Sequence, residues 1–179
     1  MEPLMNLMDQ GEKLIGHSLH PAIVALPLGA WAVSNVSDAM GLMTGQPSYD
    51  DSARISMAVG LVGAAGAILT GLHDYSYIPR TREPSHSIAT RHGIGNAVVS
   101  TLFVASYVLR VRSNQAGRRP GVVARALACA GGCLMLYTSW LGGKLVEEQG
   151  EAVKPIIKEQ NEQAKKDEQA KRNLAGAPG

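Results

Sequence analysis

The chain has 179 residues, with 17 basic and 15 acidic side chains and a formal net charge of +2. This near-neutral balance excludes a general nucleic-acid binder, which presents a strongly basic surface. The two cysteines, Cys129 and Cys133, are too few for a disulfide scaffold or a four-cysteine zinc site. They lie four residues apart in an apolar stretch. We interpret them as small packing residues, with a two-thiol metal or redox site as the alternative.

Charged side chains are absent from four long stretches of the sequence, which are residues 21–37, 55–72, 93–109 and 126–143. Each stretch has 17 or 18 residues, and neighbouring small or apolar residues lengthen most of them. A helix of about 20 residues crosses a hydrocarbon core about 30 Å thick, whereas apolar core helices of soluble proteins are shorter. The sequence therefore predicts an all-α, integral-membrane four-helix bundle, with spans at 20–43, 55–73, 92–111 and 122–146.

The two ends of the chain differ in character from the spans. Apolar residues at helical spacing near the start predict an amphipathic N-terminal helix, lying on the membrane or against the bundle; they are Leu4, Leu7, Met8, Leu14 and Ile15. The acidic start does not fit a cleavable signal peptide. Charged and amide residues after Gly150 predict a polar, partly helical tail, which is either a soluble extension or a partner-docking helix. We divide the chain into 1–16, 17–150 and 151–179.

Small residues recur at a spacing of four in the second span, as Gly60-x-x-x-Ala64 and Gly63-x-x-x-Ala67, and they cluster in the fourth span. Small residues let helices approach closely in lipid. We therefore expect these two spans to be interior or to form a homo-oligomer. No serine, cysteine or threonine lies in a recognisable nucleophile motif, and no carboxylate lies in the middle of a span. The sequence accordingly favours a protein that is not an enzyme.

All five histidines fall on one side of the predicted bundle; they are His17, His20, His73, His86 and His92. Interfacial anchoring explains aromatic rings but not this clustering. Asn96 shares a helix face with His92, and Asp74 provides a carboxylate beside the imidazoles. The candidate cofactor ligands are His17, His20, His92 and Asn96, and the candidate metal ligands are His20, Asp74 and His92. Three interpretations remain open: a hydrogen-bonded polar cap, a bound haem or transition metal, and proton or substrate handling.

A polar patch of Ser34, Asn35, Ser37 and Asp38 lies at the opposite end of the first span. Such groups are costly in lipid, so we expect them to face the protein interior. Arg125 is a candidate partner of Asp38, although its side chain could instead extend to the interface. A proton-linked transporter would need a polar path from Asp38 to the histidines, and the later spans have no charged group midway.

Four elements occur in the order typical of one family. They are Gly16-His17-Ser18-Leu19-His20-Pro21 with Leu26-Pro27-Leu28-Gly29 and Asp38, then Gly71-Leu72-His73-Asp74-Tyr75, then His92-x-x-x-Asn96, then Leu141-Gly142-Gly143-Lys144-Leu145-Val146 with Gly150 and Val153. Residues 16–153 thus resemble domain-of-unknown-function family 2231. The resemblance implies a four-helix membrane protein without an established activity.

Some members of that family are joined to Rieske iron–sulfur domains, which implies a role near electron transfer. The tail of this chain has neither cysteine nor histidine, so it carries no such cluster itself. The motif match carries over His17, His20, Asp74, His92 and Asn96, whereas His73 falls at a variable position of the family pattern. Glu147 and Glu148 replace the family's usual aromatic-basic continuation.

Five of the six arginines at the end opposite the histidines crowd one short loop and its flanks: Arg110, Arg112, Arg118, Arg119 and Arg125. This density favours the cytoplasm for that end and the outer compartment of a bacterial cytoplasmic membrane for the histidines. The test is to fuse to the tail a reporter that is active only in the cytoplasm. Activity of this fusion would reverse the assignment.

The sequence favours a small membrane accessory protein of an electron-transfer assembly, with the lipid bilayer and redox subunits as partners. A non-catalytic scaffold and a proton-linked transporter are the alternatives.

Overall fold

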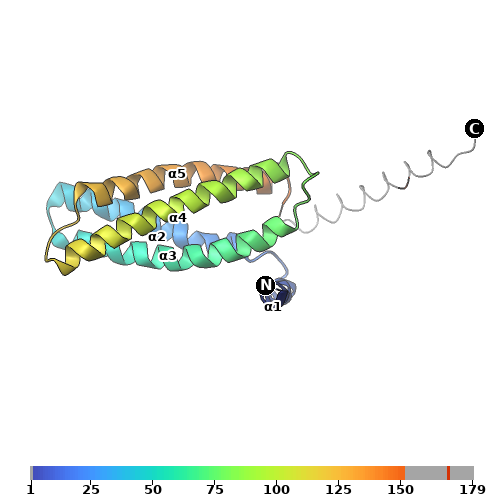
Figure 1. Cartoon of the computed structure of the whole chain (residues 1–179), viewed down its shortest axis with the longest axis horizontal. Helices are drawn as coiled ribbons and strands as arrows, with labels where there is room; N and C mark the ends of the chain where they lie inside the picture. The colour runs from blue at the N-terminus through green and yellow to red at the C-terminus, as the bar shows by residue number, and fades with distance from the viewer. Residues whose placement is uncertain (1, 152–168, 170–179) are drawn as a thin grey trace, which may run out of the picture.

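The computed structural model describes residues 2–151 and residue 169, and within them it has five helices and no strands. The helices are α1 (Glu2–Ile15), α2 (His20–Thr44), α3 (Pro47–Ser76), α4 (Ser85–Gln115) and α5 (Val122–Glu147) (Figure 1). Helices α2 to α5 are long and apolar enough to cross a membrane. The predicted all-α fold with four candidate spans is confirmed. The predicted polar helix of the tail lies outside the described residues, apart from Glu151 and Gln169.

Two helices begin earlier than the uncharged stretches indicate. Helix α3 starts at Pro47 rather than at residue 55, and α4 starts at Ser85 rather than at residue 92. Proline suits the first turn of a helix because its missing N–H has no intrahelical partner there. The added turns contain charged residues, which are tolerated where a span leaves the hydrocarbon. The length of a charge-free stretch therefore indicates how much of a helix is suited to the hydrocarbon. It is shorter than the whole helix.

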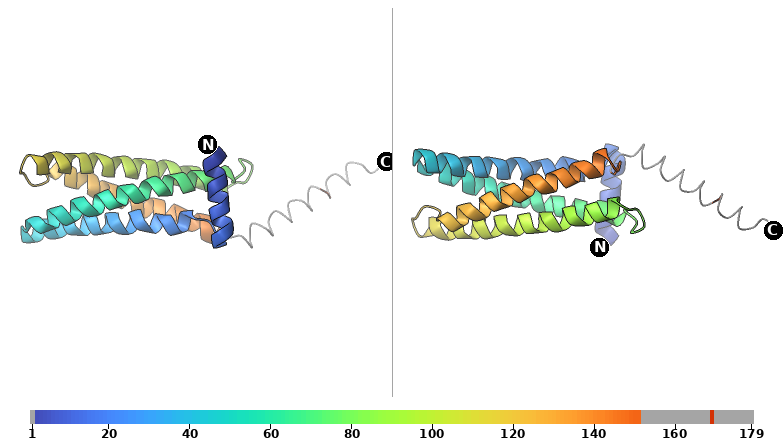
Figure 2. Two further views of the ribbon diagram at one scale, coloured as in Figure 1. Left: turned by 90° about the horizontal axis from the view of Figure 1, so that it is seen from below. Right: turned by 90° about the horizontal axis from the view of Figure 1, so that it is seen from above.

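Helices α2 to α5 run up and down in sequence and form a four-helix bundle (Figure 2). Helices α2 and α4 each pack against α3 and α5, so they are diagonal to each other. The starts of α2 and α4 and the ends of α3 and α5 lie at one end, which we name the histidine end. The opposite end is named the arginine end. Helix α1 lies crosswise over the histidine end (Figure 2).

The outer surface of the bundle is apolar, and its interior contains polar and small residues. Val62, Ile94 and Leu136 are 74%, 63% and 70% exposed, whereas the hydroxyl side chains of Ser106 and Thr138 are fully buried. An apolar surface of this extent is unusual for a soluble monomer. A lipid bilayer covers it, while the interior hydroxyls are satisfied by hydrogen bonds.

The centre of the bundle is an aromatic pair from the two diagonal helices. The rings of Trp31 and Phe103 stack with centroids 4.1 Å apart and planes 11° apart. Glycines of the two flanking helices lie against these rings. A Cβ atom at Gly60 would overlap the Trp31 ring, and one at Gly131 would lie 2.9 Å from Phe103 Cε2. The small residues of α3 and α5 therefore pack against side chains of the same chain, as expected if these two spans are interior.

The two halves of the bundle repeat the same contacts. Ser34 Oγ donates to the carbonyl of Ala53 over 2.9 Å, joining α2 to α3. Ser106 Oγ donates to the carbonyl of Ala124 over 2.6 Å, joining α4 to α5. These serines are 72 residues apart and the alanines 71. The hairpins α2–α3 and α4–α5 are thus similar units related by an approximate two-fold axis along the bundle, a parallel repeat that the sequence analysis did not detect.

Candidate functional site: the histidine end

A pair of imidazoles lies across the bundle at the histidine end. The rings of His20 on α2 and His92 on α4 have centroids 6.4 Å apart and planes at 88°. Both residues precede the central aromatic pair by 11 positions, which is about three helical turns. A Cβ atom at Gly71 would lie 2.9 Å from His20 Cε1, and one at Gly142 would lie 3.0 Å from His92 Cε1. The imidazole pair therefore resembles the central pair of Trp31 and Phe103. In both pairs one ring comes from α2 and one from α4, and glycines of α3 and α5 lie beside the rings.

Hydrogen bonds define the tautomer of His92. Its Nδ1 lies 2.8 Å from the carbonyl oxygen of Thr138, which only accepts, so Nδ1 donates. The Asn96 amide nitrogen lies 3.1 Å from Nε2 and donates to it. The Thr138 hydroxyl in turn donates to Asn96 Oδ1 over 3.0 Å. The ring is therefore neutral with its lone pair on Nε2, which is the form that ligates metals.

His20, at the equivalent place in the first hairpin, also has a hydrogen bond at Nδ1. Its Nδ1 lies 3.1 Å from Thr70 Oγ1. The single hydroxyl proton of Thr70 is directed to the carbonyl of Gly66 over 3.0 Å, so Oγ1 accepts from His20 Nδ1. Thr70 therefore holds Nδ1 of His20 as the Thr138 carbonyl holds Nδ1 of His92.

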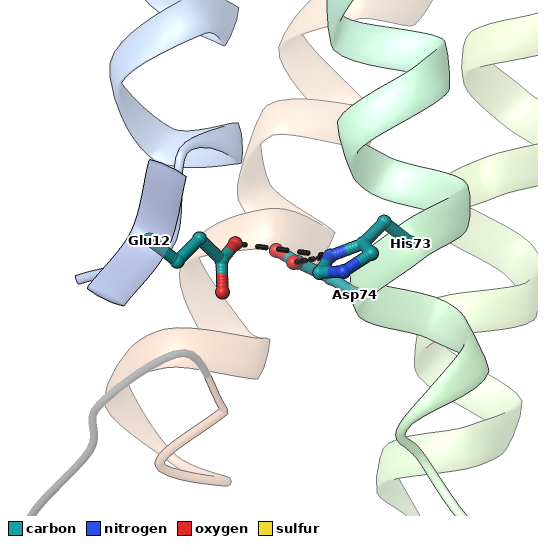
Figure 3. Close-up of side chains that lie close together, drawn as sticks. All are labelled: Glu12, His73 and Asp74. Atoms are coloured by element: carbon teal, nitrogen blue, oxygen red, sulfur yellow. Dashed lines mark ion pairs between the residues drawn. The ribbon is translucent and has the colours of Figure 1, made fainter. Parts of the chain in front are cut away.

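A second cluster surrounds His73 at the end of α3, and its imidazole is only 1% exposed (Figure 3). Its Nε2 lies 3.0 Å from Asp9 Oδ1 of α1. Its Nδ1 lies 3.5 Å from Asp74 Oδ1 and 3.8 Å from Glu12 Oε1. Among the described residues, Glu12, His73 and Asp74 form the group whose candidate ligand atoms all lie within 4.8 Å of one another.

Outer hydrogen bonds hold this cluster in place. Ser18 Oγ donates to Asp74 Oδ2 over 2.7 Å, and the Tyr77 hydroxyl donates to Asp9 Oδ1 over 3.0 Å. The hydrogen bond with His73, followed by that from Tyr77, lowers the pKa of the Asp9 carboxyl. Asp9 raises the pKa of the Tyr77 hydroxyl through the same bond. Asp9 is therefore a carboxylate that only accepts, and it attaches α1 to the end of α3.

The structure brings together three of the four predicted cofactor ligands, His20, His92 and Asn96. It leaves His17 apart, because this exposed side chain bonds through Nδ1 to the Ser18 carbonyl at 2.9 Å. Asp74, predicted as a metal ligand with His20 and His92, lies in the Glu12–His73 cluster instead. Whether any of these residues binds a cofactor stays a prediction.

Asp9 and Glu12 belong to this cluster although the sequence did not predict them as site residues. Their three-residue spacing, which places both carboxylates on one face of the N-terminal helix, is the signal that the sequence offers for them. His73 falls at a variable position of the family pattern, so the resemblance assigns it no role. Its burial and its three carboxylate neighbours come from where α1 lies, which no local pattern indicates.

The polar patch at the arginine end is an ion-pair network. Asp38 Oδ1 accepts from Arg110 Nη1 over 2.9 Å, and a second bond joins Asp38 Oδ2 to Arg110 Nη2. Arg125, the predicted partner, is near Asp38 at 3.8 Å but bonds more closely to Asp50 at 2.6 Å. The sequence predicts Arg110 as one of the arginines flanking the loop at this end and not as the partner of Asp38. The central aromatic pair lies between Asp38 and the histidines, which argues against the polar path a transporter requires.

The sequence of this bundle matches one known family over most of its length. No curated protein and no solved structure matches the chain significantly. The family match covers residues 16–155, from the turn before α2 to beyond the end of α5, and it leaves α1 outside. The chain therefore belongs to the family described as "Predicted membrane protein (DUF2231)", a domain-of-unknown-function family.

Proposed function

We propose that this protein is a small membrane accessory protein of an electron-transfer assembly that binds haem or a transition metal between His20 and His92. The observation that carries the proposal is the separation of 6.4 Å between their ring centroids, on helices diagonal to each other. Two imidazoles on opposite sides of one ion, with metal–nitrogen bonds of about 2.0–2.1 Å, have centroids roughly 6 Å apart. The two rings therefore have the spacing that a shared ion requires.

The chemistry of the donor set fits such a group. The Nδ1–H groups of both imidazoles are held, by the Thr70 hydroxyl and by the Thr138 carbonyl, so Nε2 is the nitrogen of each ring that would ligate a metal. Outer hydrogen bonds of this kind orient metal-ligating histidines. Nε2 of His92 would hold the metal or haem iron in place of the Asn96 amide, and Asn96 would keep its bonds to the His92 carbonyl and to Thr138. Gly71 and Gly142 keep the flanks of both rings free of side chains.

A metal or haem held this way supplies one-electron chemistry. The protein's own residues bind and orient it. The stacked Trp31 and Phe103 rings close the site towards the membrane interior. The electron-transfer role draws further support from the family resemblance. The protein lies in a bacterial cytoplasmic membrane under this proposal, with its histidine end towards the outer compartment.

The test is spectroscopic and elemental analysis of the full chain purified in mild detergent. We expect a Soret band, or one equivalent of a transition metal, at about one group per chain. His20→Ala and His92→Ala should each abolish it because each removes one of two ligands. His86→Ala is the matched control, since His86 lies at the same end but bonds to Tyr75. The proposal fails if the chain carries neither haem nor metal, or if both ligand variants retain the group.

A scaffold role is the second candidate, favoured by the position of α1. This helix lies across the histidine end with Leu7 64% and Leu14 88% exposed (Figure 2). These leucines offer an apolar face to lipid or to another membrane subunit. Under this hypothesis, removing residues 2–15 abolishes copurification of a partner protein from native membranes while leaving any optical spectrum unchanged. Unchanged copurification counts against it.

A further inference from the structure

We propose that Glu12, His73 and Asp74 bind a divalent transition-metal ion that fastens α1 to the end of α3. This site is separate from the His20–His92 pair and shares no residue with it. The three side chains come from two helices that are far apart in the sequence, and they point towards one another (Figure 3).

The distances are those of ligands around one ion. Two nitrogen or oxygen ligands on a tetrahedral ion, with bonds of about 2.0–2.2 Å, lie about 3.4 Å apart. The observed separations from His73 Nδ1 are 3.5 Å to Asp74 and 3.8 Å to Glu12. Both are longer than a normal N–H···O hydrogen bond. The ligand atoms of the imidazole and the two carboxylates are thus spaced as the ligands of one ion are.

The outer hydrogen bonds orient the ligand atoms towards one another. The Asp9 carboxylate accepts from His73 Nε2–H, so Nδ1 is the ring nitrogen that faces Glu12 and Asp74 and would ligate an ion. A carboxylate behind a ligating histidine is the arrangement that fixes ring orientation at metal sites. Ser18 engages Asp74 Oδ2, so Oδ1 is the oxygen that faces His73. Because His73 is only 1% exposed, its ring has little freedom to turn away.

Charge gives an independent reason. Three carboxylates, from Asp9, Glu12 and Asp74, approach one imidazole at a partly buried site. Negative charges gathered at one place repel one another, and a cation between them relieves that repulsion. A divalent ion neutralises the two ligating carboxylates. One nitrogen and two oxygens without a thiolate suit Zn²⁺, Fe²⁺ or Mn²⁺ rather than Cu⁺, with water completing the coordination.

The test is a titration of the chelator-treated full chain in detergent with zinc chloride. We expect one zinc per chain at this site, and at least tenfold weaker binding for Glu12→Gln and for Asp74→Asn. Asp9→Asn should weaken binding about 10- to 100-fold, because outer-shell partners have effects of that size. Glu147→Gln is the matched control, since this exposed carboxylate belongs to the last turn at the same end. Repeating the titration in His20→Ala/His92→Ala protein separates this site from the imidazole pair.

A second measurement reports on the link between the helices. Lys13 is exposed and follows Glu12 directly, so trypsin cleavage after it monitors α1. Zinc should slow this cleavage at least fivefold in the wild-type chain and leave its rate unchanged in Glu12→Gln. The proposal is overturned if zinc binds wild type and Glu12→Gln equally, or if it does not protect Lys13. The cluster is then only an imidazole hydrogen-bonded and ion-paired to carboxylates, a result that leaves the His20–His92 proposal untouched.

Discussion

Asp38→Asn is expected to destabilise the bundle by about 3–5 kcal/mol, the cost of breaking a buried ion pair by removing one partner. The Arg110 side chain is 0% exposed and the Asp38 side chain 8% exposed. Without the carboxylate, the Arg110 guanidinium stays inside the bundle with no ion-pair partner among the described residues, because Asp50 is already engaged by Arg119 and Arg125. The free energy of unfolding, measured by titrating a denaturing detergent into mild micelles, checks this.

The matched comparisons use the same chain. Asp51→Asn breaks an exposed ion pair with Arg54 and should cost less than about 1 kcal/mol. Asp38→Leu combined with Arg110→Leu removes both buried charges, and its loss should be much smaller than that of Asp38→Asn. If Asp38→Asn costs no more than Asp51→Asn, the ion pair contributes nothing to stability, and the structural role assigned to it here is wrong.

Gly60→Ala is expected to destabilise by about 3 kcal/mol, near the upper end for overpacking a well-packed core. Its new methyl group would overlap the Trp31 ring. That ring cannot move aside easily, because it stacks on Phe103 with centroids 4.1 Å apart and its Nε1 donates to the Met57 carbonyl over 3.4 Å. The measurement is again the free energy of unfolding in micelles, together with the near-ultraviolet circular dichroism of the aromatic residues.

Gly93→Ala is the control, since nothing lies within 4 Å of a Cβ atom at that position. It should be neutral, or stabilising by about 0.5–1 kcal/mol, because alanine favours a helix more than glycine does. Replacing Trp31 with leucine should relieve the overlap and make the two changes strongly non-additive. If Gly60→Ala and Gly93→Ala change the free energy of unfolding equally, Gly60 is not in close contact with the Trp31 ring in the protein.

Much of the architecture could be predicted from the sequence because lipid constrains each segment separately. The charge-free stretches predicted the four candidate spans, and their alternation placed all five histidines at one end. The spacing of small residues in α3 correctly indicated close helix packing. The boundaries of α3 and α4 were less accurate, since the charged turns from Pro47 and from Ser85 lie beyond the charge-free stretches.

The repeat of two hairpins was not detected in the sequence because few of its equivalent residues are alike. His20 corresponds to His92 and Gly71 to Gly142, but the equivalent of Asp38 is Arg110. That last pair has opposite charges, and the two residues meet near the two-fold axis. Asp38 and Arg110 are dissimilar residue types, so a sequence comparison does not pair them. Their equivalent positions in the two hairpins become evident only in the three-dimensional structure.

By itself, the sequence determined that this chain has four lipid-compatible helices and that its imidazoles lie at a single end, since span length and side-chain polarity are local properties. Only the tertiary structure decided which groups meet. The rotation of α2 and α4 brings His20 to His92, and the crosswise position of α1 brings Asp9 to His73 across 64 residues of sequence. Those contacts depend on how all the helices pack together, so no single segment encodes them.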